Sequence, residues 1–236
     1  MTAAINGAAL VTGGTGALGR AVVAELLDAG AAVVATWMVE GEREAVESEL
    51  GERGDLRLVE ADLLAEGGVD DAVAAAAEAG PVRALVNLVG GFASGERLHE
   101  SDPAELEKML ALNLTTAVNA CRAAIPALLE AGESAIVCVS ARTALQPFRG
   151  GAAYAISKAA VLALIRALDA DYRDDGIRAN AVLPSVLDTP ANRAATPDAD
   201  FDRWVAPEEI AAVIRFLASP ASSPVSGAEI PVYGRA

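Results

Sequence analysis

The sequence has few of the residues on which several kinds of site depend. Its 236 residues include two cysteines, Cys121 and Cys138, and one histidine, His99. These are too few for a disulfide framework or for a zinc site built from cysteine and histidine. His99 stands among charged residues, where a solvated side chain is expected, so a catalytic triad that depends on histidine is disfavoured. We expect a site that holds no metal.

Basic residues and long apolar runs are scarce as well. Lysine and arginine total 18 against 33 acidic residues, and the formal net charge is −15. A chain with this charge repels the phosphates of nucleic acids. No apolar run is long enough to cross a bilayer, and residues 1–7 lack the basic and apolar stretches of a signal sequence. We therefore expect a cytoplasmic protein that binds neither nucleic acid nor membrane.

The length of the chain and its alternating patterns predict the fold. With 53% apolar residues, 236 residues can bury one sizeable core, so we expect a single domain over residues 1–236. Short runs rich in β-branched residues alternate with longer helical patterns. This predicts an α/β fold, a Rossmann-type doubly wound parallel sheet of about seven strands with helices on both faces. The predicted strands are 8–11, 32–36, 56–60, 84–88, 135–139, 178–183 and 229–232, and the predicted helices are 18–28, 42–50, 68–79, 104–129, 153–171 and 207–217.

A glycine-rich turn follows the first predicted strand and opens the first predicted helix. Glycine permits positive φ values and lets the main chain approach a pyrophosphate, while the helix N-terminus offers free amides. At the first strand-to-helix junction of an alternating chain, such a turn predicts dinucleotide binding. The candidate cofactor-binding residues in this turn are Gly13, Thr15, Gly16, Ala17, Leu18 and Gly19.

A second motif lies in the predicted helix 153–171. Tyr154 and Lys158 are one helical turn apart, so both side chains project from the same face. A phenol with a pKa of about 10 is a poor acid–base group at neutral pH, but a neighbouring ammonium and a cationic nicotinamide both favour the phenolate. Tyr154 can then relay a proton while a hydride moves to or from the nicotinamide.

Together these motifs resemble the short-chain dehydrogenase/reductase family, and the likeness extends over nearly the whole chain. The family's loop reads Thr-Gly-x-x-x-Gly-x-Gly; here Thr12, Gly13 and Gly19 match, Ala17 replaces the middle glycine, and Gly16 lies one place earlier. The resemblance implies NAD(P)(H) as the cofactor, a small-molecule substrate, and a homodimer or homotetramer.

The resemblance also assigns further residues to the site. Asn113 would shape its helix and complete a water-linked proton path to Lys158. Asp62 would contact the adenine, and Thr189 would contact the nicotinamide carboxamide. The other implied cofactor-binding residues are Trp37, Leu63, Asn87, Val89, Gly90, Pro184, Tyr154 and Lys158.

The choice between NAD and NADP is open. The end of the second predicted strand, at Trp37, offers neither an acid for the ribose 2′-hydroxyl nor a base for a 2′-phosphate. Arg43 could reach a 2′-phosphate, but Glu40 and Glu42 flank it and oppose the same charge.

The family's substrate-holding serine is displaced in this sequence. It lies thirteen residues before the tyrosine, where this chain has Ala141; the candidate catalytic serine, Ser140, is one place earlier and faces the other side of the sheet unless a bulge intervenes. The alanine and the segment from Leu183 to Trp204 resemble the dihydropteridine reductase branch, whose substrate needs no serine to polarise a ketone.

Three functions follow from these residues. The first is an NAD(P)(H)-dependent oxidoreductase that transfers a hydride between the nicotinamide and a small carbonyl or alcohol. The second is a reductase of a C=N substrate, in the manner of the dihydropteridine reductases. The third is a non-catalytic sensor of nicotinamide dinucleotides, which the presence of Tyr154, Lys158 and Asn113 argues against.

Overall fold

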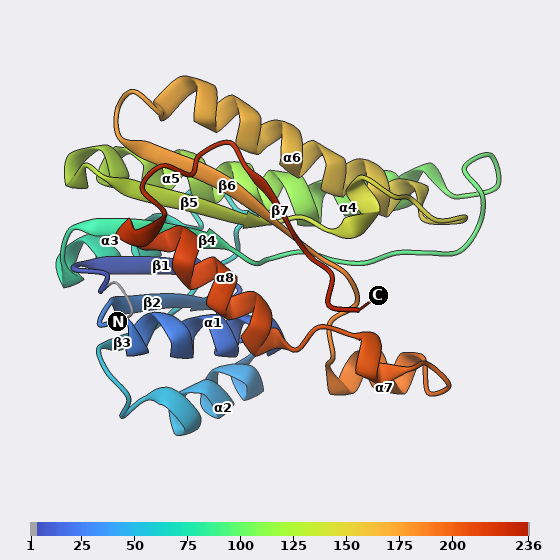
Figure 1. Ribbon diagram of the computed structural model, residues 1–236, viewed down its shortest axis with the longest axis horizontal. Coiled ribbons are helices and arrows are strands. Elements are labelled where there is room, and N and C mark those ends of the chain that lie inside the picture. The colour runs from blue at the N-terminus through green and yellow to red at the C-terminus, as the bar shows by residue number, and fades with distance from the viewer. Residues whose placement is uncertain (1–3, 236) are drawn as a thin grey trace.

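The computed structural model describes residues 4–235, whose strands form one parallel sheet in the order β3-β2-β1-β4-β5-β6-β7 (Figure 1). The prediction of a doubly wound, seven-stranded α/β fold is confirmed, and each predicted strand lies within two residues of an observed one. The strands are β1 Ala8–Thr12, β2 Ala32–Trp37, β3 Leu56–Glu60, β4 Val82–Asn87, β5 Ser134–Val139, β6 Ile177–Pro184 and β7 Glu229–Val232.

Helices cover both faces of the sheet because the strands bury apolar side chains on both sides. One face packs against α1 Ala17–Asp28, α2 Glu40–Leu50 and α8 Pro207–Ala218. The other face packs against α3 Asp70–Ala79, α5 Thr116–Ala131 and α6 Ala152–Tyr172. In the part of the chain from residue 4 to 235, no helix combines the length and apolar character that a membrane crossing requires.

The helix predicted over residues 104–129 is helical throughout, but the structure divides it by a change of helix type that was not predicted. The chain there forms α4 Pro103–Leu110, a π-helical segment Ala111–Thr115, and α5 Thr116–Ala131. A π-helical segment inserts extra backbone into a helix and often marks a functional site. It contains Asn113, whose buried side chain bonds to the chain that leaves β4, so a tertiary contact accompanies the departure from α-helical geometry.

The short helix α7, Pro190–Ala195, was not among the predicted elements. Its first residue is a proline, and Thr189 caps it by accepting a hydrogen bond from the amide of Asn192 at 3.2 Å. This hydrogen bond gives Thr189 a role in starting α7, beside the cofactor contact that the resemblance implies.

The sheet order defines where a ligand can bind. From β1 the chain continues to β2 and then β3 on one side of β1 in the sheet, and from β3 it returns to β4 on the other side of β1. The strands β1 and β4 are therefore neighbours, and the chain leaves them toward opposite edges of the sheet. In open α/β sheets, ligands bind in the crevice at the carboxyl ends of such strands. The glycine-rich turn after β1 lies at this crevice.

Candidate active site

The loop after β1 has a backbone surface that requires glycine. Gly13 has a φ of +67°, and its amide donates to the Thr36 hydroxyl on β2 at 3.0 Å. A Cβ at Gly19 would lie 2.3 Å from the carbonyl oxygen of Gly13. The N-terminus of α1, at Gly16, has no side-chain cap, so its amides are available to a phosphate. These features fit a dinucleotide.

A cleft of about 570 Å³ lies beside this loop. At its edge, the indole nitrogen of Trp37 is buried without a hydrogen-bond partner among the described residues, which leaves a donor for a ligand. Asp62 lines the cleft, and its carboxylate accepts from the amide of Leu64 at 2.9 Å. The lining residues are Gly13, Thr15, Gly16, Thr36, Trp37, Met38, Val39, Glu42, Ala61, Asp62, Leu63, Leu64, Leu88, Val89, Gly90, Leu112 and Thr116.

A second hollow of about 460 Å³ adjoins the cleft. Thr15, Val39 and Glu42 line both spaces and therefore form the ridge between them. The remaining residues of the second hollow are Ala17, Arg20, Gly41, Ala45, Thr189, Pro190 and Ala191.

Asn113 ties the chain after β4 to α6. Its side-chain oxygen accepts from the Gly91 amide at 2.9 Å, and its side-chain nitrogen donates to the Gly91 carbonyl at 3.1 Å and to the Ser157 hydroxyl at 2.9 Å. A Cβ at Gly90 would lie 2.5 Å from the Asn113 oxygen and 3.0 Å from the Lys158 ammonium nitrogen. Gly90 therefore lets the backbone pass directly over the predicted catalytic residues.

Burial sets the proton affinities of the predicted catalytic pair. Lys158 is buried and donates to the carbonyl of Val139 at 3.0 Å, and this burial lowers its pKa to about 8. Burial raises the pKa of Tyr154 to about 12. Desolvation is the cause of this shift, and it acts against the preference for the phenolate that a neighbouring ammonium provides.

Ser140 and Ala141 have different surroundings. Ser140 is buried, and its hydroxyl donates to the carbonyl of Lys158 on α6 at 2.8 Å. Ala141, at the family's serine position, follows it and is also buried. The hydroxyl of Ser140 thus joins β5 to α6 through the backbone of the lysine.

The structure does not place every predicted cofactor residue at these spaces. The Asn87 side chain lies in the core, where it accepts from the Thr12 hydroxyl at 3.2 Å and contacts the sulfurs of Cys121 and Cys138 at 3.4 Å each. Asn87 therefore steadies β1, β4, β5 and α5. Five further predicted cofactor residues also lie outside both linings: Leu18, Gly19, Tyr154, Lys158 and Pro184.

The sequence analysis missed two polar residues that shape the site: Thr36 accepts from the glycine-rich loop, and Ser157 accepts from Asn113. It considered Glu42 only as a charge near a 2′-phosphate, and the structure adds that Glu42 accepts from the Thr15 hydroxyl at 3.1 Å. The sequence did contain a signal for Ser157. It lies three residues after Tyr154, so the two side chains share one face of the helix.

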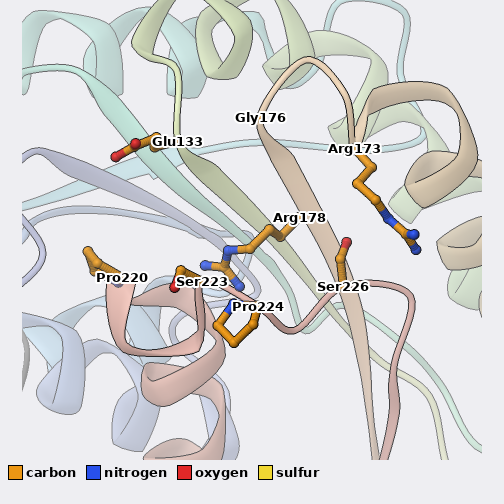
Figure 2. Close-up of a pocket in the computed structure, with 8 residues that line it drawn as sticks. All are labelled: Glu133, Arg173, Gly176, Arg178, Pro220, Ser223, Pro224 and Ser226. Atoms are coloured by element: carbon orange, nitrogen blue, oxygen red, sulfur yellow. The ribbon is translucent and has the colours of Figure 1, made fainter.

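A hollow of about 430 Å³ lies at the amino ends of the strands, where β5 and β6 begin. Figure 2 shows the Arg178 side chain extending from β6 toward the segment that contains Pro220 and Ser223. Its guanidinium donates to the carbonyls of Leu217 and Ser219 at the end of α8, at 3.0 and 3.2 Å. Arg178 therefore satisfies carbonyl groups at the end of α8, and its hollow shares no lining residue with the cleft beside the glycine-rich loop.

The comparisons with known proteins agree with this geometry. Residues 7–200 match the family described as short chain dehydrogenase. The 3beta-hydroxysteroid dehydrogenase 2 of Eggerthella lenta is 32% identical over 96% of this chain and 93% of its own length. The D-threitol dehydrogenase of Mycolicibacterium smegmatis is also 32% identical, over 96% of this chain and 91% of its own length.

Solved structures are similar as well. The NADPH-bound short chain oxidoreductase of Pseudomonas aeruginosa PAO1, described as containing an atypical catalytic center, has a TM-score of 0.90 and 28% identity, with 97% and 95% of the two chains covered. This chain belongs to the short chain dehydrogenase family. It is an oxidoreductase that uses NAD(P).

Proposed function

We propose that the enzyme transfers a hydride between the nicotinamide and a small alcohol or carbonyl substrate, while Tyr154 moves the accompanying proton. The observation that carries this proposal is the placement of Tyr154 and Lys158 on one turn of α6, with the Lys158 ammonium against Gly90 at the cleft. Two similar proteins are named for alcohols, a hydroxysteroid and threitol. The intact pair disfavours a non-catalytic sensor.

Tyr154 is suited to donate a proton in the reductive direction. The bound nicotinamide supplies the hydride. A pKa of about 12 keeps the phenol protonated at neutral pH, and it can then donate to a carbonyl oxygen as that oxygen gains negative charge. The Lys158 ammonium lies one turn away and stabilises the phenolate that remains.

Because Ala141 has no hydroxyl, another group must hold the substrate oxygen in place of the family's serine. The hydroxyl of Ser140 is engaged with the backbone of Lys158, so we assign the serine's role to Tyr154 and a water molecule. The same alanine favours a second candidate, the reduction of a C=N substrate in the manner of the dihydropteridine reductases. An iminium-like carbon needs no serine to polarise it.

The surroundings of Tyr154 indicate an apolar, ring-shaped substrate. The ring of Phe92 lies 5.0 Å from that of Tyr154 in an edge-to-face arrangement, and Phe148 stacks 6.2 Å from Phe92. The Phe92 side chain is 66% exposed, so an apolar ring can cover it and remove that surface from water. A flexible polyol gains little from this surface.

The test measures initial rates at 340 nm with NADH and NADPH. The substrates are cyclic ketones, short linear hydroxyketones and a quinonoid dihydropterin, and Tyr154→Phe is the matched variant. We expect turnover of cyclic ketones that the variant loses while its dinucleotide affinity is kept. Faster turnover of the dihydropterin than of every ketone would replace this function with the C=N reductase. Full activity of the variant would remove Tyr154 from the reaction.

We also propose that the enzyme is a cytoplasmic homo-oligomer. Apolar side chains are exposed on the outer helices, with Leu129 on α5 at 41% and Ile156 on α6 at 44%, and a second copy could cover them. Both cysteines are free, which suits a reducing compartment. Light scattering should give a dimer or tetramer mass, and cell fractionation should find the enzyme with soluble cytoplasmic proteins.

A further inference from the structure

The cofactor cleft is lined by acids and by no base among the described residues. Glu42 and Asp62 are its charged lining side chains. NAD(H) and NADP(H) differ at the adenosine ribose, where the first has a 2′-hydroxyl and the second a 2′-phosphate. A carboxylate can accept a hydrogen bond from the hydroxyl but repels the phosphate. The strand-end residue at which this discrimination is expected is Trp37, which has no charge.

The Glu42 carboxylate is held at the cleft by a defined contact. It accepts from the hydroxyl of Thr15, which is buried in the glycine-rich loop, at 3.1 Å. Glu42 lies in the first turn of α2, directly after the β2 end, and it contributes to the ridge shared by the two spaces. Its negative charge therefore lies between the end of β2 and the phosphate-binding loop.

The nearby arginines are paired with acids. Arg43 lies 5.7 Å from the centre of the Trp37 ring, but it donates to Glu40 at 2.7 Å and to Glu47 at 2.5 Å and does not line the cleft. Arg20 lines the second hollow and lies 3.7 Å from Glu49. A 2′-phosphate would have to separate one of these arginines from its acids before it gained a cationic partner.

We propose that Glu42 makes this enzyme selective for NAD(H) over NADP(H). This inference rests on the proposed use of the cleft for a nicotinamide dinucleotide. The acid that reads the ribose comes from the first turn of α2 and is fixed by Thr15, whereas the strand end itself carries an indole.

The test is calorimetric titration of ADP-ribose and 2′-phospho-ADP-ribose, two fragments that lack nicotinamide and cannot be turned over. The native enzyme should bind ADP-ribose at least about tenfold more tightly, as expected for a carboxylate facing a doubly charged phosphate. In Glu42→Gln, which keeps an oxygen to accept from Thr15, the preference should shrink several-fold through tighter binding of the phosphorylated fragment. Titrations with NADH and NADPH should show the same change.

Glu44→Gln is the matched control, because it removes the same charge from the same helix at an exposed position outside the cleft. It should leave the preference unchanged. Equal affinities of the native enzyme for the two fragments, or equal effects of the two substitutions, would overturn the role of Glu42 while dinucleotide binding stands. Failure of both fragments and both dinucleotides to bind would overturn the proposed function together with this inference.

Discussion

At the scale of single residues, Ser140 and Ala141 show how one position decides the chemistry available to a site. The Ser140 hydroxyl joins β5 to α6 through the Lys158 carbonyl. Ser140→Ala should cost about 1 kcal/mol of unfolding free energy, the usual contribution of one hydrogen bond, and leave kcat within about twofold. Urea unfolding and steady-state rates measure these quantities.

Ala141→Ser provides the comparison, since it introduces a hydroxyl where the resemblance places the substrate-holding serine. Ala141→Ser should raise kcat for ketones. Ser140→Ala should not lower kcat for the same ketones. A hundredfold loss of kcat in Ser140→Ala, with unchanged stability, would instead make Ser140 the catalytic serine.

Lys158 should give the stability of the fold a measurable pH dependence. Its pKa is about 8 in the folded chain and about 10.5 when solvated, so between these values the unfolded chain binds more protons. Stability should therefore rise with pH in this window, by at most about 1.4 kcal/mol per pH unit. Urea unfolding at pH 7 to 10 should show this slope in the native enzyme and its absence in Lys158→Met. Parallel pH profiles for the two proteins would contradict the lowered pKa.

At the scale of elements, the regular parts of the fold were predictable and the π-helical segment was not. The strands alternate with helices in a pattern set by burial on both faces, and that pattern is written in runs of neighbouring residues. The irregular segment Ala111–Thr115 coincides with contacts from Asn113 to Gly91 and Ser157, which are distant in sequence. No local pattern reports such contacts.

The candidate site shows the same difference between local motifs and contacts that join distant parts of the sequence. The glycine-rich loop and the spacing of Tyr154 and Lys158 are local, so the sequence sufficed to propose them. The contact between Thr15 and Glu42 joins residues 27 positions apart, and the bonds of Asn87 into the core depend on the packing of β1, β4 and β5. The raised pKa of Tyr154 comes from burial in the folded chain, which the spacing of Tyr154 and Lys158 does not report.

Asn113 should matter for both stability and the position of the chain after β4. Asn113→Ala removes the acceptor for the Gly91 amide and the donor to Ser157, which should cost about 2 kcal/mol of unfolding free energy. The Gly91 amide should then exchange its hydrogen faster, because its partner is lost. Hydrogen exchange followed by NMR measures this directly.

Ser157→Ala is a partial version of the same change, since it removes one of these bonds and leaves Gly91 held. Its Gly91 amide should exchange as in the native enzyme. Unchanged exchange in Asn113→Ala would show that the loop is held by other contacts.

At the scale of the whole molecule, the charge of the chain opposes the arrival of its cofactor. The formal net charge is −15, and a nicotinamide dinucleotide is itself an anion. At low ionic strength, about 0.01 M, the Debye length is about 30 Å and the ligand meets the repulsion of much of the surface; near 0.15 M it is about 8 Å, and local groups dominate.

The rate constant for association of NADH should therefore rise several-fold as salt increases from about 0.01 to 0.15 M. Stopped-flow fluorescence of NADH measures this rate, and an uncharged cyclic ketone at saturating cofactor should keep its KM across the same range. A fall in the association rate with salt would mean that the amides of the glycine-rich loop and the N-terminus of α1 attract the pyrophosphate more strongly than the acidic surface repels it. The electric field of these backbone amides would then speed the binding of the dinucleotide. The backbone of one loop would in that case compensate for the small number of basic residues.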